Sequence, residues 1–202
     1  MTEAPGDHPE PPGDLSEWSP LLFSLRPGQV LSRIHRQGQE PIFFGRTGQN
    51  RFDSPDQSFG VLYLGLDEHC AFIETFGQST GIQIVTRKAL DDRPLAYLTV
   101  TASLKLIDLA TTGGLTRIGA DGWLLTGSHA IAQRWSAALR GHPTQPDGIL
   151  YPPRHDLARR ACALFDLPVT VFEVNEAGSL MAPAHTHLLA GILDTYGFGL
   201  ID

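Results

Sequence analysis

The segment GVLYLGLDEHCAFIETFG occupies residues 60–77 and carries strong local signals for secondary structure. Its first part is a compact apolar run bounded by glycines, which is typical of a buried strand. The part that follows predicts a helix over 67–78, because Asp67 can cap the helix N-terminus and Gly77 lies near the expected end. The sequence therefore predicts a buried strand that runs directly into a helix.

The rest of the chain mixes short strands and helices without regular alternation. Helices are predicted over 128–141, with Ser128 as cap and Gly141 at the end, and over 185–197. A polar segment at 47–60 predicts a long loop. Apolar runs predict further strands at the start of 29–45 and at 81–90, 94–101, 103–110, 149–151, 161–166 and 168–174. This order favours a compact α+β fold, a mixed sheet with flanking helices, over a doubly wound sheet.

Charge and hydropathy exclude several classes of protein. Among 202 residues, Lys plus Arg number 15 and Asp plus Glu number 22, so the formal net charge is −7. Neutralising a nucleic-acid backbone needs a surplus of cations, so direct nucleic-acid binding is not expected. No apolar run approaches the roughly 18 residues that cross a bilayer, so no membrane association is expected.

The N-terminal stretch MTEAPGDHPEPPGD is acidic and proline-rich and lacks the features of a secretory signal. Because it holds few apolar groups to bury, we expect residues 1–19 to form a disordered tail. Residues 20–202 are expected to form one domain. Cys70 and Cys162 lie in apolar segments without a C-x-x-C pattern, which predicts buried thiols in a reducing cytoplasm.

Common metal and cofactor motifs are missing from the sequence. The eight histidines form no H-E-x-x-H or Cys/His cluster, so no metal site is predicted. The glycine-rich segment at 112–122 has neither a dinucleotide fingerprint nor a P-loop, and no G-x-S-x-G elbow exposes a serine nucleophile.

One group of polar residues stands out around the strand–helix unit. Arg33 and His35 lie two residues apart on a predicted strand and so face the same side. Arg51 lies in the polar loop, Tyr63 in the buried strand and Glu74 in the apolar helix. A charge on an apolar helix is costly unless it is paired or faces a cleft. Glu74 is therefore either half of a core salt bridge with an arginine or part of a functional site.

Several segments, taken together, resemble the RES domain, a family named for its Arg, Glu and Ser positions. They are LSRIHR (31–36), NRFDSP (50–55), GVLYLGLDEHCAFIETFG (60–77), DGILY (147–151) and ALFD (163–166). The resemblance runs from about Leu25 to about Asp166. Its most specific part is the block from Asn50 to Gly77, where R-F, L-Y-L and A-F-x-E-T occur in order.

The resemblance implies a compact α+β fold related to ADP-ribosyltransferase toxins. Many members of the family are toxins of bacterial toxin–antitoxin pairs that an Xre-type helix-turn-helix antitoxin restrains, so such a partner is expected. Known activities in the family are degradation of NAD and, in some members, ADP-ribosylation of a protein. NAD is therefore the expected substrate, and homo-oligomer formation is left open.

The family's functional positions carry over onto named residues of this chain. The catalytic candidates are Glu74, Arg33 and Tyr63, and the NAD-binding candidates are Arg33, Arg51, Tyr63, His35 and Asn50. Paired guanidinium groups suit a pyrophosphate because they donate bidentate hydrogen bonds. Tyr63 can stack on nicotinamide or place its hydroxyl on a ribose. Glu74 can stabilise the positive charge that develops on the ribose when the nicotinamide bond breaks.

The family serine has no equivalent here. It normally falls in a G-I-x-Y-x-S-x-R segment, which in this chain reads GILYPPRHD (148–156), with Pro153 at the serine position. Proline offers neither a hydroxyl nor a backbone N–H. Either the serine's task is supplemental, or Arg154 or Tyr151 takes it over, or this member is catalytically weak.

The sequence is therefore compatible with three functions. The first is an NAD-consuming RES-type toxin that cleaves the nicotinamide–ribose bond by hydrolysis or phosphorolysis. The second is a protein ADP-ribosyltransferase that uses the same cleft. The third is a non-catalytic module that binds a nucleotide or the antitoxin, which Pro153 favours. The sequence does not identify the acceptor of the ADP-ribosyl group.

Overall fold

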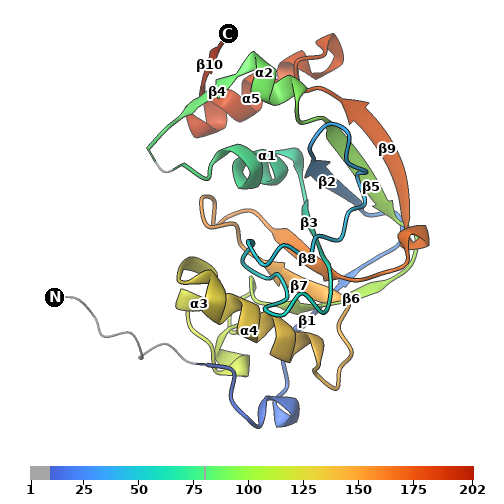
Figure 1. Cartoon of the computed structure of the whole chain (residues 1–202), viewed down its shortest axis with the longest axis vertical. Coiled ribbons are helices and arrows are strands. Elements are labelled where there is room, and N and C mark those ends of the chain that lie inside the picture. Colours follow the sequence, from blue (N-terminus) through green and yellow to red (C-terminus); the bar gives the residue numbers. More distant parts are fainter. Residues whose placement is uncertain (1–9, 80) are drawn as a thin grey trace, which may run out of the picture.

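The structure is a computed structural model that describes residues 10–79 and 81–202 (Figure 1). The strands are β1 (Leu22–Leu25), β2 (Val30–Ile34), β3 (Val61–Gly65), β4 (Ile84–Thr86), β5 (Leu95–Val100), β6 (Leu104–Asp108), β7 (Gly148–Tyr151), β8 (Ala161–Phe165), β9 (Phe172–Gly178) and β10 (Gly199–Ile201). The α-helices are α1 (Glu68–Phe76), α2 (Arg87–Asp91), α3 (Trp123–Thr126), α4 (His129–Arg140) and α5 (Thr186–Tyr196).

The strands form one large and one small sheet. The large sheet has eight strands in the order β1-β6-β7-β8-β3-β2-β5-β9, and β4 pairs with β10 in the small sheet. Neighbours in the large sheet are antiparallel except for β6 and β7, which are parallel. The predicted α+β class, a mixed sheet with flanking helices, is confirmed.

The buried strand predicted at the start of 60–77 is β3, which lies between β8 and β2 inside the sheet. Its side chains alternate between two cores. Val61 packs in the core beneath α4, whereas Leu62 and Leu64 pack on the opposite face of the sheet. Because both faces of β3 are covered, the strand reads as a continuous apolar run.

The three predicted longer helices are present. The Asp67 carboxylate accepts the Cys70 backbone N–H at 2.7 Å and caps α1, which ends at Gly77. Ser128 and Gly141 flank α4, as predicted. Helix α5 ends at Gly197, whose φ of 65° is a left-handed conformation that glycine adopts without strain.

The helices cover the sheet in two groups, which lie at opposite ends of the view in Figure 1. Helices α3 and α4 bury Leu124, Trp135 and Leu139 against one face of the large sheet. Helices α1, α2 and α5 share a separate core with the ends of β2 and β5, which includes Phe72 and Ile192. The sheet region between the two groups holds the site described below.

Two strand predictions need correction. The segment 81–90 is a strand only at Ile84–Thr86, because the Thr86 hydroxyl accepts the Ala89 backbone N–H at 3.0 Å and starts α2. The segment 168–174 begins with a 3-10 turn at Val169–Val171 before β9 starts. Helix α3 and strand β10 were not predicted. Each of these elements is too short to show a periodic pattern.

Part of the predicted tail contacts the domain. Leu15, in a 3-10 turn at Leu15–Glu17, is buried in the core beneath α4, and Glu10 forms an ion pair with Arg134 of α4. Residues 1–9 of that segment lie outside the described residues. The division of the chain at residue 19 stays a prediction.

Two further expectations concern the cysteines and the membrane. Cys70 and Cys162 are free and buried, as predicted. Within the described ranges, no helix combines the length and the apolar character that crossing a bilayer requires.

Gly65 packs directly against the first turn of α1. A Cβ at this position would lie 2.7 Å from the backbone nitrogen of Ala71 and 2.7 Å from the backbone oxygen of Asp67. Because neither atom can move without shifting α1, we expect Gly65→Ala to lower the free energy of unfolding by about 1–3 kcal/mol, measured by urea denaturation.

The matched control is Gly191→Ala, since nothing lies within 4 Å of a Cβ at this position in α5. There we expect alanine to raise the free energy of unfolding by about 0.5–1 kcal/mol. An unchanged unfolding midpoint for Gly65→Ala would contradict the packing of α1 against β3.

Candidate active site

A cavity of about 560 Å³ lies between β2, β3, α1 and the segment that follows β7. Five residues predicted from the sequence line it, namely Arg33, Asn50, Arg51, Tyr63 and Glu74. The structure thus brings together side chains from two strands, one helix and one loop. Its volume is in the range of small-molecule and cofactor pockets.

The cavity is strongly cationic although the whole chain is acidic. Its described lining contains a single carboxylate, Glu74, and the guanidinium groups of Arg33, Arg36, Arg51, Arg93 and Arg154. In the described ranges, none of these arginines forms an ion pair with an acidic side chain. Their positive charge is therefore available to an anionic ligand.

Glu74 is a half-buried carboxylate that accepts one hydrogen bond from the residues that the structure describes. Its Oε2 accepts the hydroxyl proton of Tyr151 at 3.1 Å. Burial raises the pKa of Glu74, while the Tyr151 hydrogen bond and the charges of Arg51 and Arg154 oppose that shift. The described chain shows no ion pair to Glu74, so the interpretation as half of a core salt bridge is not supported.

Tyr151, the last residue of β7, is the group that orients Glu74. Its ring is buried and packs on Phe52 at a centroid distance of 4.9 Å. Burial and the neighbouring Glu74 charge hold the pKa of Tyr151 well above its usual range, so the hydroxyl stays a donor. From the sequence, Tyr151 was a candidate only for the task of the family serine. Its hydrogen bond with Glu74 could not be predicted, because no sequence pattern relates the two residues.

Arg51 is fixed by backbone carbonyls at the end of α3. Its Nη1 donates to the carbonyl of Gly127 at 2.9 Å and to that of Leu124 at 3.4 Å. Burial lowers the pKa of Arg51, which still leaves a guanidinium that is protonated at neutral pH. In the described part of the chain, its Nε and Nη2 have no protein acceptor and can donate to a ligand.

Arg33, on β2, is held in the same way. Its Nη1 donates to the backbone carbonyls of Pro41 and Phe43. Burial lowers the pKa of Arg33 to about 10, so the group remains a cation at neutral pH. Carbonyl oxygens orient both arginines without neutralising them, and this arrangement suits two negatively charged phosphate groups.

The loop that carries Arg51 is organised by Asp53, which the sequence analysis did not single out. This carboxylate is fully buried and accepts hydrogen bonds from the Thr47 hydroxyl at 2.9 Å and from the backbone N–H groups of Gln49 and Asn50, both at 3.1 Å. Satisfying several donors with one carboxylate fixes a polar segment that has no regular structure.

Tyr63 holds the same loop from the sheet. Its hydroxyl donates to Asp53 at 3.0 Å and accepts the backbone N–H of Phe52 at 2.9 Å. Because the hydroxyl is engaged inside the protein, the prediction that it contacts a ribose is not supported. The ring lines the cavity, so the predicted stacking role stays a prediction.

Helix α4 supports the loop from the other side. The amide of Gln133 donates to the carbonyls of Gly48 at 2.8 Å and Asn50 at 3.0 Å, and the Ser136 hydroxyl donates to the carbonyl of Phe52 at 2.7 Å. These polar residues sit on the buried face of an amphipathic helix. They place Arg51 at a fixed position relative to the sheet.

Two binding candidates occupy different positions from those expected. The side-chain amide of Asn50 donates to Asp53 at 3.2 Å, so it stabilises the loop although the residue lines the cavity. His35 is buried, is not part of the described lining, and its backbone N–H donates to Pro94. Strand β2 ends at Ile34, so the alternation that would place His35 beside Arg33 does not continue.

The segment after β7 also contributes to the cavity. Pro152, Arg154 and His155 line it, whereas Pro153 is buried and is not part of the described lining. His155 Nε2 lies 3.2 Å from Arg154 Nη2, and burial together with that charge lowers the pKa of His155. In residues 10–79 and 81–202, no group of three His, Cys, Asp or Glu side chains could hold a metal ion.

Comparisons with known proteins identify the family and the fold of this chain. A family model described as the RES domain matches residues 30–182, and the chain belongs to the RES domain family. Among solved structures, a chain of the M. tuberculosis MbcT–MbcA toxin–antitoxin complex is similar, with a TM-score of 0.54 and 14% identity over 86% of this chain and 92% of that chain. At this identity the likeness shows a shared fold. The search of curated proteins found no match.

The partial burial of the Glu74 carboxylate predicts how the stability of the protein depends on pH. Because the pKa of Glu74 is raised above 4.5, folding favours its protonated form. Protonated Glu74 therefore contributes fully to the stability of the folded protein below pH 4.5. This contribution is lost as the pH rises through the pKa of Glu74 in the folded state. We expect Glu74→Gln to unfold at a higher denaturant concentration than the wild type at neutral pH, with a difference that vanishes below pH 4.5.

Glu176→Gln is the control, because Glu176 is exposed on β9 and is not part of the described cavity lining. It should change the unfolding midpoint by little at either pH. Lower stability of Glu74→Gln at neutral pH would contradict the account of Glu74 as a destabilised buried charge.

Proposed function

We propose that this protein is an NAD-consuming RES-type toxin that cleaves the bond between nicotinamide and ribose. The observation that carries the proposal is a half-buried carboxylate, Glu74, in the same cavity as arginines that form no ion pair within the described residues. Membership of the RES domain family supports it, as does the fold shared with a chain of a toxin–antitoxin complex.

The arginines supply the binding energy for the pyrophosphate of NAD. Arg33 and Arg51 each keep N–H groups that have no acceptor in the described protein, and Arg154 adds a third cation to the cavity lining. A planar guanidinium donates two parallel hydrogen bonds to a phosphate, which an ammonium group cannot do. Binding at this place leaves the nicotinamide end of NAD free to reach Glu74.

Glu74 supplies the stabilisation of the reacting ribose. When the bond from ribose C1′ to the nicotinamide nitrogen breaks, its electron pair returns to nicotinamide, which leaves as a neutral molecule. The ribose becomes an oxocarbenium-like cation, and a carboxylate beside it stabilises that charge. Water then bonds to C1′ and loses a proton, which gives ADP-ribose. Phosphate in place of water gives the phosphorolysis product.

Tyr151 and the arginines prepare Glu74 for this task. The Tyr151 hydrogen bond fixes the carboxylate, and the charges of Arg51 and Arg154 favour its ionised form against the effect of burial on the pKa. Ionised Glu74 is the active form, so nicotinamide release should rise with pH across an acid limb above 4.5.

An antitoxin is the partner that the proposal implies, since an unrestrained NAD-consuming enzyme depletes its own cell. We propose an Xre-type helix-turn-helix protein as that partner and the cytoplasm as its location. Purification of this chain together with such a protein encoded beside it would support the pairing.

The first prediction from this proposal concerns catalysis. Purified wild-type protein should release nicotinamide from NAD, and Glu74→Gln should lower kcat by about 100-fold or more, because removing a fixed charge from an oxocarbenium site costs that much. Arg51→Lys should mainly raise KM, since lysine cannot replace a bidentate guanidinium. Liquid chromatography of the reaction products measures both effects.

Arg46→Lys is the matched control for Arg51→Lys, because Arg46 pairs with Asp166 and is not part of the described cavity lining. Wild-type and Glu74→Gln proteins that leave NAD equally intact would overturn the proposal. Labelled NAD added to a cell lysate separates the acceptors: free ADP-ribose indicates hydrolysis, and a discrete labelled protein indicates ADP-ribosyl transfer.

The second prediction concerns the missing serine. Because Pro153 is buried and is not part of the described lining, we expect Pro153→Ser to leave the rate of nicotinamide release within about twofold of wild type. A circular-dichroism melt checks that the variant is folded. A large gain in rate would instead identify the natural protein as a weakened member of the family.

A further inference from the structure

The segment 152–160, which joins β7 to β8, forms one wall of the cavity. It carries Arg154 and His155 into the lining but contains no helix or strand. A segment without regular structure needs other contacts to hold its side chains in place. Asp156, the residue directly after the two cavity residues, makes several contacts of this kind.

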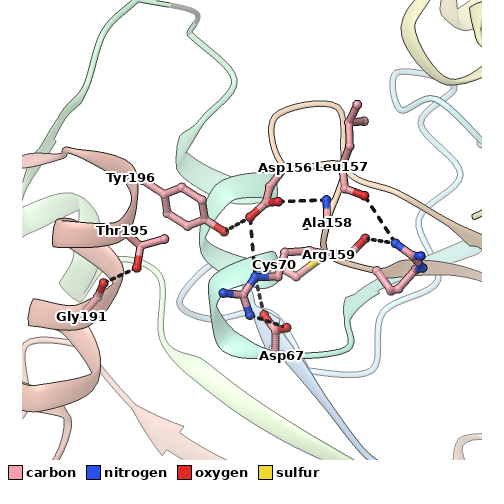
Figure 2. Close-up of polar contacts among 10 residues, drawn as sticks. Asp67, Cys70, Asp156, Leu157, Ala158, Arg159, Gly191, Thr195 and Tyr196 are labelled. Carbon is pink, nitrogen blue, oxygen red and sulfur yellow. Dashed lines mark hydrogen bonds and ion pairs between the residues drawn. The ribbon is translucent and has the colours of Figure 1, made fainter.

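Asp156 joins this segment to the last turn of α5. Its Oδ2 accepts the hydroxyl proton of Tyr196 at 2.8 Å and lies 3.5 Å from Nε of Arg159 (Figure 2). Its Oδ1 accepts the backbone N–H of Ala158 at 3.1 Å. One carboxylate thus connects a distant helix to two positions within the segment.

Arg159 continues the connection to α1. Its Nη1 lies 2.8 Å from Oδ2 of Asp67, whose other oxygen caps α1 by accepting the Cys70 backbone N–H at 2.7 Å. Figure 2 shows this chain of contacts from α5 through Asp156 and Arg159 to the start of α1. Helix α1 also carries Glu74. The network therefore connects the segment 152–160, one wall of the cavity, to the helix that holds the catalytic candidate.

The network is more than a set of surface contacts. The exposed fractions of the side chains are 18% for Asp156, 31% for Arg159 and 34% for Asp67. Partial burial and several shared hydrogen bonds make such a network stronger than isolated exposed ion pairs. The RES family model matches residues 30–182 of this chain. Tyr196 lies after that range, so its contact with Asp156 comes from a part of the chain that the family model does not match.

We propose that Asp156 is a positioning residue that, with Tyr196 and Arg159, fixes the segment 152–160 and so sets Arg154 in the cavity for ligand binding. This inference rests on the proposed function for the identity of the ligand, but not for the ordering of the segment. Arg154 acts directly on the ligand as a cation, and Asp156 acts only through it.

Amide hydrogen exchange without ligand tests the ordering of the segment. We expect Tyr196→Phe and Asp156→Asn to speed exchange of the amides at 154–160 by about tenfold, because the first removes a hydrogen bond to the carboxylate and the second removes the negative charge that strengthens its contacts. Tyr97→Phe is the matched control, since the Tyr97 hydroxyl donates to Glu68 at 2.9 Å and, among the described residues, forms no hydrogen bond with this segment. Unchanged exchange at 154–160 in both variants would overturn the proposal.

Calorimetric titration with ADP-ribose tests the action through Arg154. We expect Tyr196→Phe to weaken binding about threefold to tenfold, and to cause no further loss when Arg154→Ala is already present. A purely structural role predicts equal losses in both backgrounds, and that result would overturn the positioning role.

The two ideas fail in different ways. Wild-type protein that does not bind ADP-ribose would overturn the proposed function and the role of Asp156 in ligand binding. Faster exchange at 154–160 in that case would still support the ordering of the segment by Asp156.

Discussion

The site depends on one constraint: a half-buried carboxylate lies among guanidinium groups that form no ion pair with an acidic side chain in the described part of the chain. Glu74 is held by a tyrosine hydroxyl, whereas Arg33 and Arg51 are held by backbone carbonyls. Some arginines outside the cavity differ, since Arg46, Arg134 and Arg159 each pair with a carboxylate. Within the described residues, the cavity thus gathers guanidinium groups without such partners beside one carboxylate, where a ligand can use their charge.

This unbalanced charge has a cost that the surroundings must offset. Desolvation works against both the ionised Glu74 and the buried arginines. The cost is tolerable because the polar loop around Arg51 is rigid: Asp53 satisfies its donors, and α4 holds its carbonyls through Gln133 and Ser136. Stability is therefore given up at one place for pre-organised charge, as is common at functional sites.

The sequence predicted the elements that have strong local signals. The caps of α1 and α4 and the apolar run of β3 identified their elements because capping and burial act within a few residues. It failed at 81–90, where three strand residues are followed directly by a short helix. The family resemblance also named Arg33, Arg51, Tyr63 and Glu74, all of which the structure places in one cavity.

The sequence could not predict contacts that depend on the tertiary arrangement. The pairing of Tyr151 with Glu74 joins residues 77 positions apart, and the Tyr63 hydroxyl meets Asp53 only because the loop folds back on the strand. The position of His35 was also mispredicted. Residues two apart face the same side only within a strand, and β2 ends at Ile34. Residues that orient others, such as Asp53 and Asp156, therefore emerge from the structure alone.

Calorimetric titration of NAD into the Glu74→Gln protein, which retains the arginines but lacks the charge for cleavage, isolates the binding step. We expect saturable binding of intact NAD, which weakens when Arg51→Lys is added and stays unchanged when Arg46→Lys is added instead. No binding of NAD by folded Glu74→Gln protein would contradict the account.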